Sequence, residues 1–346
     1  MNWLNDPIKL PSQEYYQKAL ARQAQLTKPA GSLGRLEELA VRLAAMQRTE
    51  RPDVGRIGVS VFAADHGIAE AGVSAFPQAV TAEMVKNFIR GGAAVNVLAR
   101  HAEAWFEAVD VGLMQVLELE GLVVDRAGSG TANFLKRPAM TAEQLEKALN
   151  AGRNAVNRAL RQQVQLFIGG EMGIGNTTSA SALASALLTQ DPTDLTGAGT
   201  GLSSRAIPHK AGLIRQALAW HRTLLTSPLS ILQCLGGFEI AALVGAYLFA
   251  CQQGLPVLVD GFISTVAALI AVNINANAGA WFIYSHTSHE QGHRRVLEAL
   301  KAQPLLDLNM RLGEASGALT ATPILQMACK LHNEMATFKQ AQITTQ

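Results

Sequence analysis

The stretch QLFIGGEMGIGNTTSASALASALL, residues 165–188, contains the pattern that decides the fold of this protein. A short apolar run at 165–168 meets a glycine-rich corner, and a segment rich in Ala and Leu follows. A strand that leads through a corner into a helix is the repeating unit of α/β proteins with a parallel sheet. We therefore expect one strand, one corner and one helix of such a sheet here.

The same order of strand, corner and helix recurs along the chain from about residue 56. Short β-branched or aromatic runs end at polar or glycine-rich residues, and long Ala-rich stretches follow them. This alternation predicts an α/β fold in which helices cover both faces of a parallel sheet. Ligands bind at the carboxyl ends of such strands, so the corners are expected to converge on one cleft. The predicted strands are 57–63, 105–111, 122–124, 165–168, 257–259 and 281–284.

Both ends of the chain are predicted to be helical. Residues 14–26 are polar with an apolar stripe, and leucines at helical spacing follow Ser32, a candidate N-cap. From Ser316 onward, apolar residues again recur at helical spacing. We expect a smaller helical domain made of residues 1–50 plus 305–346, beside a large α/β substrate-binding domain of residues 51–304.

The composition excludes several classes of protein. Among 346 residues, 49% are hydrophobic and only 16% are charged, which is too apolar for a disordered chain. The net charge is +2 and no block of Lys and Arg is present, which disfavours a nucleic-acid partner. Three widely spaced cysteines and no visible secretory signal predict buried thiols and a cytoplasmic location.

Two long uncharged stretches, 240–259 and 261–285, are separated only by Asp260. Their length alone would suit membrane spans. A Gln-Gln-Gly-Leu-Pro sequence at 252–256 interrupts the first, and the second carries an asparagine at 273, 275 and 277. We therefore expect buried elements of the fold, and no membrane span.

The corner at 169–181 is the first candidate site. Its glycines allow close approach of a ligand, and the free amides of a helix start favour a phosphate. It is neither a Walker loop nor a convincing dinucleotide fingerprint, so a plain turn is the alternative. A carboxylate such as Glu171 repels a phosphate, so its presence suggests a cationic group on the ligand.

Two further corners carry charged residues. Glycines 197, 199 and 201 precede Lys210, which would supply a point charge for a phosphate or, alternatively, lie solvated at the start of a helix near 211. Glu314 lies in a glycine-flanked corner before the last helix. It is either a partner for the helix dipole or a general base that works near neutral pH.

Residues 289–293 read H-E-Q-G-H, a match to the zinc-binding pattern H-E-x-x-H. In a zinc peptidase His289 and His293 would bind the metal and Glu290 would be the base. The glycine at 292 weakens the helix that this motif requires, and the residues before it are typical of a strand end and a helix cap. A zinc metallopeptidase is therefore kept as a rival hypothesis.

Five motifs in order resemble the nicotinate-nucleotide–dimethylbenzimidazole phosphoribosyltransferase family. The likeness extends from about Thr27 to Met335. It implies a Rossmann-like parallel sheet flanked by helices, a helical domain from both chain ends, and a homodimer. The motifs are TKPAGSLGRLE (27–37), ADHG (64–67), GEMGIGNTT (170–178), LVDGF (258–262) and RLGEASG (311–317).

The resemblance also implies a reaction. The phosphoribosyl group of nicotinate mononucleotide moves to 5,6-dimethylbenzimidazole with inversion at C1′, giving α-ribazole 5′-phosphate and nicotinate, in cobalamin biosynthesis. No metal and no cofactor are implied. By position, Glu314 matches the general base and Glu171 and Gly173 match the ribose-phosphate corner. The positions that match phosphate contacts are Gly199, Lys210, Gly261 and Ser288.

One segment departs from the family pattern. Some members place a Ser and a Gln near the acceptor base, where this chain has Phe76 and Met84. With Pro77, these residues predict a more apolar acceptor-base pocket that tolerates more than one base. A nucleotide-binding module without activity is the rival to an enzyme, and turnover of the two substrates separates them.

Overall fold

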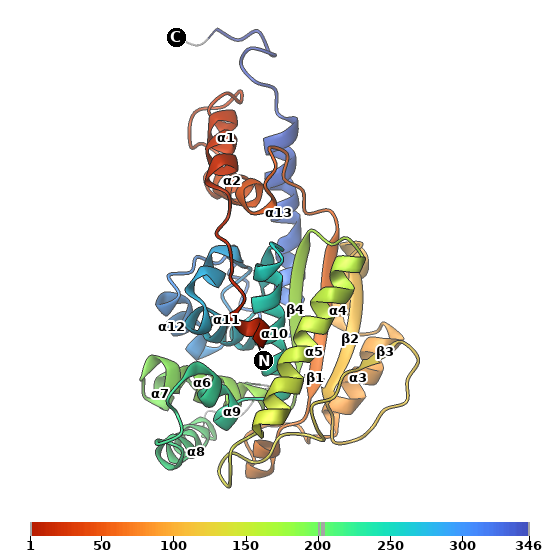
Figure 1. The fold of residues 1–346 in the computed structure, drawn as a ribbon, viewed down its shortest axis with the longest axis vertical. Helices are drawn as coiled ribbons and strands as arrows, with labels where there is room; N and C mark the ends of the chain where they lie inside the picture. The colour runs from red at the N-terminus through yellow and green to blue at the C-terminus, as the bar shows by residue number, and fades with distance from the viewer. Residues whose placement is uncertain (1, 200, 202–204, 345–346) are drawn as a thin grey trace.

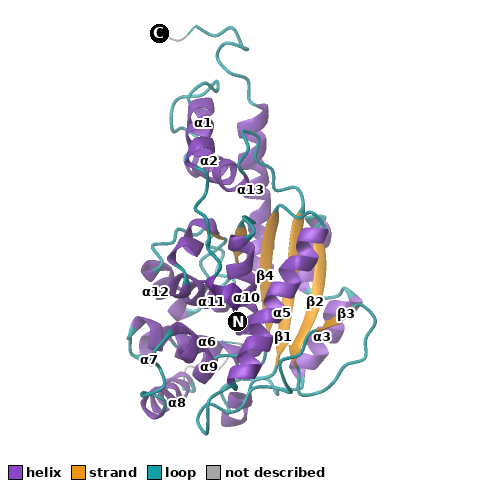
Figure 2. Ribbon diagram, in the orientation of Figure 1, coloured by secondary structure: helices purple, strands orange, loops and turns teal. Residues whose placement is uncertain are grey.

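The computed structural model describes residues 2–199, 201 and 205–344. Its centre is a six-stranded, wholly parallel sheet in the order β3-β2-β1-β4-β5-β6 (Figure 2). This is the strand order of a Rossmann-like fold, as predicted. The strands are β1 (Ile57–Ala64), β2 (Trp105–Gly112), β3 (Leu122–Val124), β4 (Leu166–Met172), β5 (Val257–Val259) and β6 (Phe282–Tyr284).

Helices cover both faces of the sheet because its central strands are apolar on both sides. Every residue of β1 is buried. Helices α5 and α10 pack together on the face in front in Figure 1, and α13 passes behind β4 on the other face. The helices along the sheet are α3 (Val80–Arg90), α4 (Ala94–His101), α5 (Ala142–Arg161), α10 (Phe238–Gln252), α11 (Phe262–Ile274) and α13 (Ser316–Glu334).

A second group of helices lies beside the carboxyl ends of β4, β5 and β6 (Figure 1). It consists of α6 (Asn176–Leu188), α7 (Pro192–Leu195), α8 (Ile207–Trp220), α9 (Pro228–Leu235) and α12 (Gln291–Ala299). Short 3-10 helices occur at Asn2–Asn5, Gly67–Ala71 and Ala276–Trp281.

Helices from the two terminal segments of the chain pack together above the amino edge of the sheet (Figure 1). There α1 (Gln13–Gln23) and α2 (Arg35–Gln47) pack with the far half of α13. The first residues return to the large part of the molecule, because the Trp3 indole donates to Asn150 at 2.8 Å and the Trp281 indole donates to the Lys9 carbonyl at 2.8 Å.

The two long uncharged stretches form α10 and α11 in the core. Every α10 residue from Phe238 to Cys251 is buried. Among the described residues, no helix has both the length and the apolar character needed to cross a bilayer. The three cysteines are buried and unpaired, as expected.

Several predicted boundaries were wrong. Ser32 does not cap a helix: α2 begins at Arg35 after Gly34, whose φ of 53° suits glycine, and it is Ser12 that caps α1. Helix α8 begins at Ile207 rather than near 211, because Pro208 fits the first turn of a helix.

The strand predicted at 165–168 continues through Met172 as β4. Two glycines within it allow close packing, because a side chain on Gly169 would overlap Leu243 and one on Gly170 would lie 2.8 Å from the Ala315 nitrogen. The corner therefore begins only after Met172, and Glu171 is a strand residue.

Candidate functional site

The segments after β4, β5 and β6 line one cavity, as predicted for these strands, but the corner after β1 at 65–67 does not line it. Its walls come from the corner after β4, the segments that follow β5 and β6, the loop before α8 and the corner before α13. Residues predicted to bind substrate that line it are Glu171, Gly173, Gly199, Gly261 and Ser288. Lys210 and Glu314 lie directly behind lining residues, as described below.

Glu171 lies near the end of β4 and lines this cavity. The Asn176 amide donates to its Oε2, and Gly313 packs against its Oε1, where any side chain at 313 would collide with it. Burial raises the pKa of Glu171 well above its ordinary value, and the charges of Glu239, Asp260 and Glu314 raise it further. The neutral, protonated form of Glu171 is therefore favoured in the free protein.

Glu314 is held in an unusual backbone conformation. Residues 313, 314 and 315 have φ values of 82°, 59° and 64°, all in the left-handed region. For the two residues other than glycine this costs on the order of 1–2 kcal/mol each. Close packing on Gly170 and the start of α13 maintain this conformation, which turns the chain sharply beside the Glu171 carboxylate.

The surroundings of Glu314 suit a general base. The residue is only 5% exposed. Burial, followed by the charge of Asp260, raises its pKa to about 7. A carboxyl with this pKa can both hold and release a proton near neutral pH, which a simple partner for the helix dipole does not need.

Asp260 joins the end of β5 to the start of α13. Its Oδ1 accepts a hydrogen bond from the Ala318 amide at 2.7 Å, in the first turn of α13. Burial raises the pKa of Asp260, and the nearby His286 opposes that shift. The His286 ring lies between Gly261 and Gly317, and a side chain at 317 would overlap it. Neither residue was assigned a role from the sequence, although Asp260 lies in the LVDGF motif (258–262).

Lys210 is buried rather than solvated, so the alternative interpretation as a surface lysine was wrong. Only 1% of it is exposed, and its Nζ donates to Thr177 Oγ1 at 2.8 Å. Burial lowers its pKa to about 8, while the charge of Glu290 acts in the opposite direction. Its Nζ is 3.5 Å from where a Cβ of Gly199 would lie, so this cation is directly behind the cavity wall. Thr200, in the same glycine-rich corner, lies outside the described residues.

Ser288 and Gly261 form another part of the cavity wall. The Ser288 amide donates to His293 Nδ1 at 2.8 Å, and its Oγ accepts from the Glu290 amide at 3.3 Å. The hydroxyl hydrogen of Ser288 is therefore directed away from that amide and can be donated to a ligand. A Cβ at Gly261 would lie 3.8 Å from Ser288 Cβ, so both residues face the same space.

The H-E-x-x-H segment does not form a metal-binding helix, so the zinc hypothesis is not supported. Helix α12 begins at Gln291, which leaves His289 outside it. Both ring nitrogens of His293 are engaged, Nδ1 by the Ser288 amide and Nε2 by Thr265 Oγ1 at 2.8 Å. Within the described ranges, no group of three or more His, Cys, Asp or Glu residues is arranged to hold a metal ion.

The residues predicted for the acceptor-base pocket lie in the loop before α3 and on α3 itself. Phe76 is 51% exposed and Pro77 is exposed in the loop before α3, while Met84 on α3 is half-buried. None of the three is among the described residues that line the cavity. Helix α3 contacts the corner directly, because the Ile174 amide donates to Thr81 Oγ1 at 3.1 Å.

A buried pair that sequence reasoning missed lies beneath the same corner. His66 Nε2 lies 2.6 Å from Glu239 Oε1, and neither side chain is exposed. Gly173 packs against the His66 ring, and Ser179 Oγ lies 3.1 Å from its Nδ1. The ADHG motif contains His66, but Glu239 lies in an apolar stretch 173 residues away with no local pattern to mark it.

Comparisons with known proteins agree with this geometry. A family model described as "Phosphoribosyltransferase" matches residues 8–343. The nicotinate-nucleotide–dimethylbenzimidazole phosphoribosyltransferase of Pseudomonas putida (strain W619) is 54% identical over 99% of this chain and 97% of its own length. The protein of the same name from Xanthomonas axonopodis pv. citri (strain 306) is 54% identical over 99% of each chain.

Solved structures show the same likeness in three dimensions. The enzyme of that name from Thermus thermophilus superimposes with a TM-score of 0.91 at 42% identity, over 97% of this chain and all of its own. A structure titled CobT from the same organism has a TM-score of 0.92 at 43% identity, over 96% of this chain and all of its own.

The raised pKa of Glu314 predicts a pH-dependent stability. Between its ordinary pKa of 4.5 and about 7 the native state binds more protons than the unfolded state, so stability falls as pH rises through this range. The free energy of unfolding of the wild type should fall by about 2 kcal/mol between pH 5 and pH 8, and Glu314→Gln should not show this fall. Urea unfolding at both pH values measures this difference, with the exposed Glu298→Gln as control. Equal pH dependence in wild type and Glu314→Gln would contradict it.

Proposed function

The chain belongs to the nicotinate-nucleotide–dimethylbenzimidazole phosphoribosyltransferase family, and we propose that Glu314 and the adjoining cavity carry out its reaction. The protein is a pentosyltransferase of cobalamin lower-ligand synthesis. It transfers the phosphoribosyl group of nicotinate mononucleotide to 5,6-dimethylbenzimidazole, and nicotinate leaves. The zinc peptidase and the inactive nucleotide-binding module have no support among the relatives.

The chemistry calls for a base on the acceptor side only. The bond that breaks joins ribose C1′ to a pyridinium nitrogen, which leaves as neutral pyridine without gaining a proton. The attacking benzimidazole nitrogen gains positive charge as it bonds to C1′. A base that takes the proton from the other ring nitrogen removes this charge. No step requires a metal ion.

The single observation that supports this assignment is the placement of Glu314. Its pKa of about 7 leaves it ionised in a large share of molecules at neutral pH and still basic enough to accept a proton. Glu314 comes directly after Gly313, and Gly313 packs against the Glu171 carboxylate at the cavity wall. Because the reaction inverts C1′, the acceptor must attack from the face opposite nicotinate, and Glu314 would lie on the acceptor side.

Glu171 would act on the sugar rather than on a proton. As the bond to nicotinate stretches, C1′ and the ring oxygen gain positive charge. The charges of Glu239, Asp260 and Glu314 make ionised Glu171 unfavourable in the free protein. Positive charge in the transition state would offset that cost, so the interaction would be stronger there than with the substrate.

The 5′-phosphate would bind between Lys210 and the wall formed by Ser288 and Gly261. Lys210 is the buried cation next to Gly199, and the Ser288 hydroxyl can donate from the opposite side. Backbone amides near Gly173 would add donors, since Gly173 leads into the start of α6. These groups orient the nucleotide and make no bond themselves.

The acceptor would lie against Phe76, Pro77 and Met84. Their loop is close to the buried pair of His66 and Glu239, because the side-chain amide of Gln78 donates to the His66 carbonyl at 3.4 Å. A wall of apolar side chains contacts the methyl groups of dimethylbenzimidazole but offers no hydrogen bonds with which to reject other bases.

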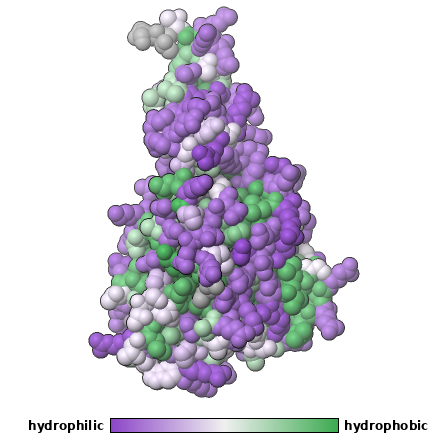
Figure 3. Space-filling model, in the orientation of Figure 1, coloured by the Kyte–Doolittle hydropathy of each residue, from purple (hydrophilic) through white to green (hydrophobic). Residues whose placement is uncertain are grey.

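The homodimer and the cytoplasmic location are part of the same proposal. A largely apolar groove on the helical end of the molecule is lined by Leu36, Met327, Leu331 and Met335, together with Lys330 and Glu334, and Met327 is 50% exposed. Polar side chains dominate much of the surrounding surface of this end (Figure 3). A second copy of the chain would cover the groove. The helical domain of residues 1–50 plus 305–346 would then be the dimerising part, beside the substrate domain of 51–304.

Glu314→Gln should retain nucleotide binding and lose turnover. Without the base we expect kcat to fall roughly 10²- to 10⁴-fold. In the wild type, kcat/KM should rise with pH and level off above about 7, because only ionised Glu314 accepts a proton. Release of nicotinate from the two substrates measures both effects, with Glu298→Gln as control. Full activity in Glu314→Gln would remove the residue from this role.

The apolar acceptor wall predicts a tolerant enzyme. In competition assays, benzimidazole and dimethylbenzimidazole should both be used, with kcat/KM values within about tenfold of each other. Restoring polarity with Phe76→Ser and Met84→Gln should widen the gap. Strict use of one base by the wild type would contradict the proposal.

The groove predicts a dimer of 36.8 kDa chains. Sedimentation at micromolar concentration should give twice the chain mass, and Met327→Glu should shift it toward the monomer. Val97→Glu is the matched control, because Val97 is similarly exposed but lies on α4. A monomeric wild type would overturn this part of the proposal.

A further inference from the structure

Glu290 places a buried carboxylate at the cavity wall that the reaction above does not use. The residue is 7% exposed and lines the same cavity as Glu171 and Ser288. Its Oε2 is fully buried and has no hydrogen-bond partner among the described residues. An unsatisfied buried carboxylate oxygen is costly, so a partner is expected to come from the ligand.

The position of this carboxylate is set by close packing. It lies directly against Gly197, where any side chain would collide with Oε2. Its own amide is held by Ser288 Oγ, and its carbonyl accepts from the His293 amide at 3.0 Å. The Glu290 backbone is therefore fixed at the start of α12.

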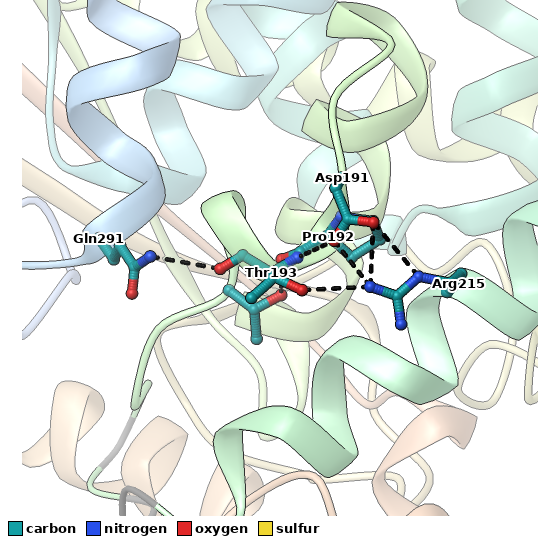
Figure 4. Close-up of polar contacts among 6 residues, drawn as sticks. Asp191, Pro192, Thr193, Arg215 and Gln291 are labelled. Atoms are coloured by element: carbon teal, nitrogen blue, oxygen red, sulfur yellow. Dashed lines mark hydrogen bonds and ion pairs between the residues drawn. The ribbon is translucent and has the colours of Figure 1, made fainter.

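Helix α7 connects the start of α12 to α8 (Figure 4). Gln291, next to Glu290, donates from its side-chain amide to the Thr193 carbonyl at 3.2 Å. On the other side of α7, Arg215 of α8 forms bonds of 2.7 and 3.0 Å with Asp191 and one of 3.1 Å with Thr193 Oγ1. Helix α8, which carries Lys210, and the start of α12 are therefore both hydrogen-bonded to α7 and its N-cap.

The chemistry of the nucleotide limits what Glu290 can bind. A carboxylate only accepts hydrogen bonds. Nicotinate mononucleotide carries two anionic groups, the phosphate and the ring carboxylate, and both would be repelled. Its good donors are the two ribose hydroxyls. The acceptor base also has an N–H, but Glu314 would take that proton on the opposite face of the sugar.

We propose that Glu290 accepts a hydrogen bond from a ribose hydroxyl and makes the enzyme specific for ribose over deoxyribose nucleotides. The inference rests on the proposed function. Acidic residues bind ribose hydroxyls in this way in other sheets of this topology. Lys210 and Glu290 would then hold the phosphate and the sugar from neighbouring positions.

The test compares nicotinate mononucleotide with its 2′-deoxy and 3′-deoxy analogues, with nicotinate release as the readout. For the wild type we expect kcat/KM to drop roughly ten- to hundredfold with at least one analogue, the loss of one hydrogen bond to a charged group. In Glu290→Gln, kcat/KM for the parent nucleotide should fall by a similar factor, mostly through a higher KM. For the analogue that the wild type uses poorly, kcat/KM should fall little further. The matched control is Glu298→Gln on the exposed face of the same helix.

A second variant moves the carboxylate without removing it. Gly197→Ala should displace Glu290 from the wall and reduce discrimination in the same way, with circular dichroism checking that it folds. If the wild type uses both analogues as well as the parent, the inference fails whatever the variants do. It also fails if Glu290→Gln discriminates as strongly as the wild type. Absence of turnover with the parent nucleotide would instead contradict the proposed function.

Discussion

The crowding of buried carboxylates at one edge of the sheet is the constraint on which the site depends. The charges of Glu239, Asp260 and Glu314 all raise the pKa of Glu171, whose own burial raises it most. Each of the three carboxylates other than Glu314 has a polar partner: Asn176 donates to Glu171, His66 lies 2.6 Å from Glu239, and an amide of α13 donates to Asp260. For Glu314, burial and Asp260 bring the pKa to about 7. This range suits proton transfer at neutral pH.

Glycine makes that crowding possible. Gly170 allows the Glu314–Ala315 backbone to lie on β4, and Gly313 allows the Glu171 carboxylate to lie against the corner. Gly317 gives the His286 ring room at the start of α13. A methyl group at Gly170 would push the Glu314–Ala315 backbone off the strand, and one at Gly313 would displace the Glu171 carboxylate. By allowing close packing, the glycines set the distances between the carboxylates and so the strength of the repulsion between them.

The alternation of strands and helices followed from periodicity, but the ends of the elements did not. A repeated alternation of apolar runs and Ala-rich stretches was enough to predict a parallel sheet. It was not enough to show that β4 runs on to Met172, because two glycines read locally as a turn. They remain in the strand because Leu243, Tyr247 and the 313–315 corner pack on them, and these contacts are distant in sequence. The H-E-x-x-H match misled for the same reason, since the start of α12 at Gln291 depends on neighbouring elements.

The sequence by itself determined the fold class, the family and the residue types at the strand ends, because these depend on short-range patterns and on motifs that keep their order. Only the tertiary structure decided that Lys210 is buried behind Gly199, that Glu239 supports His66, and that Glu290 faces the cavity unpartnered among the described residues. Burial and charge proximity set the chemistry of an ionisable group, and both arise from residues that the chain brings together over long separations.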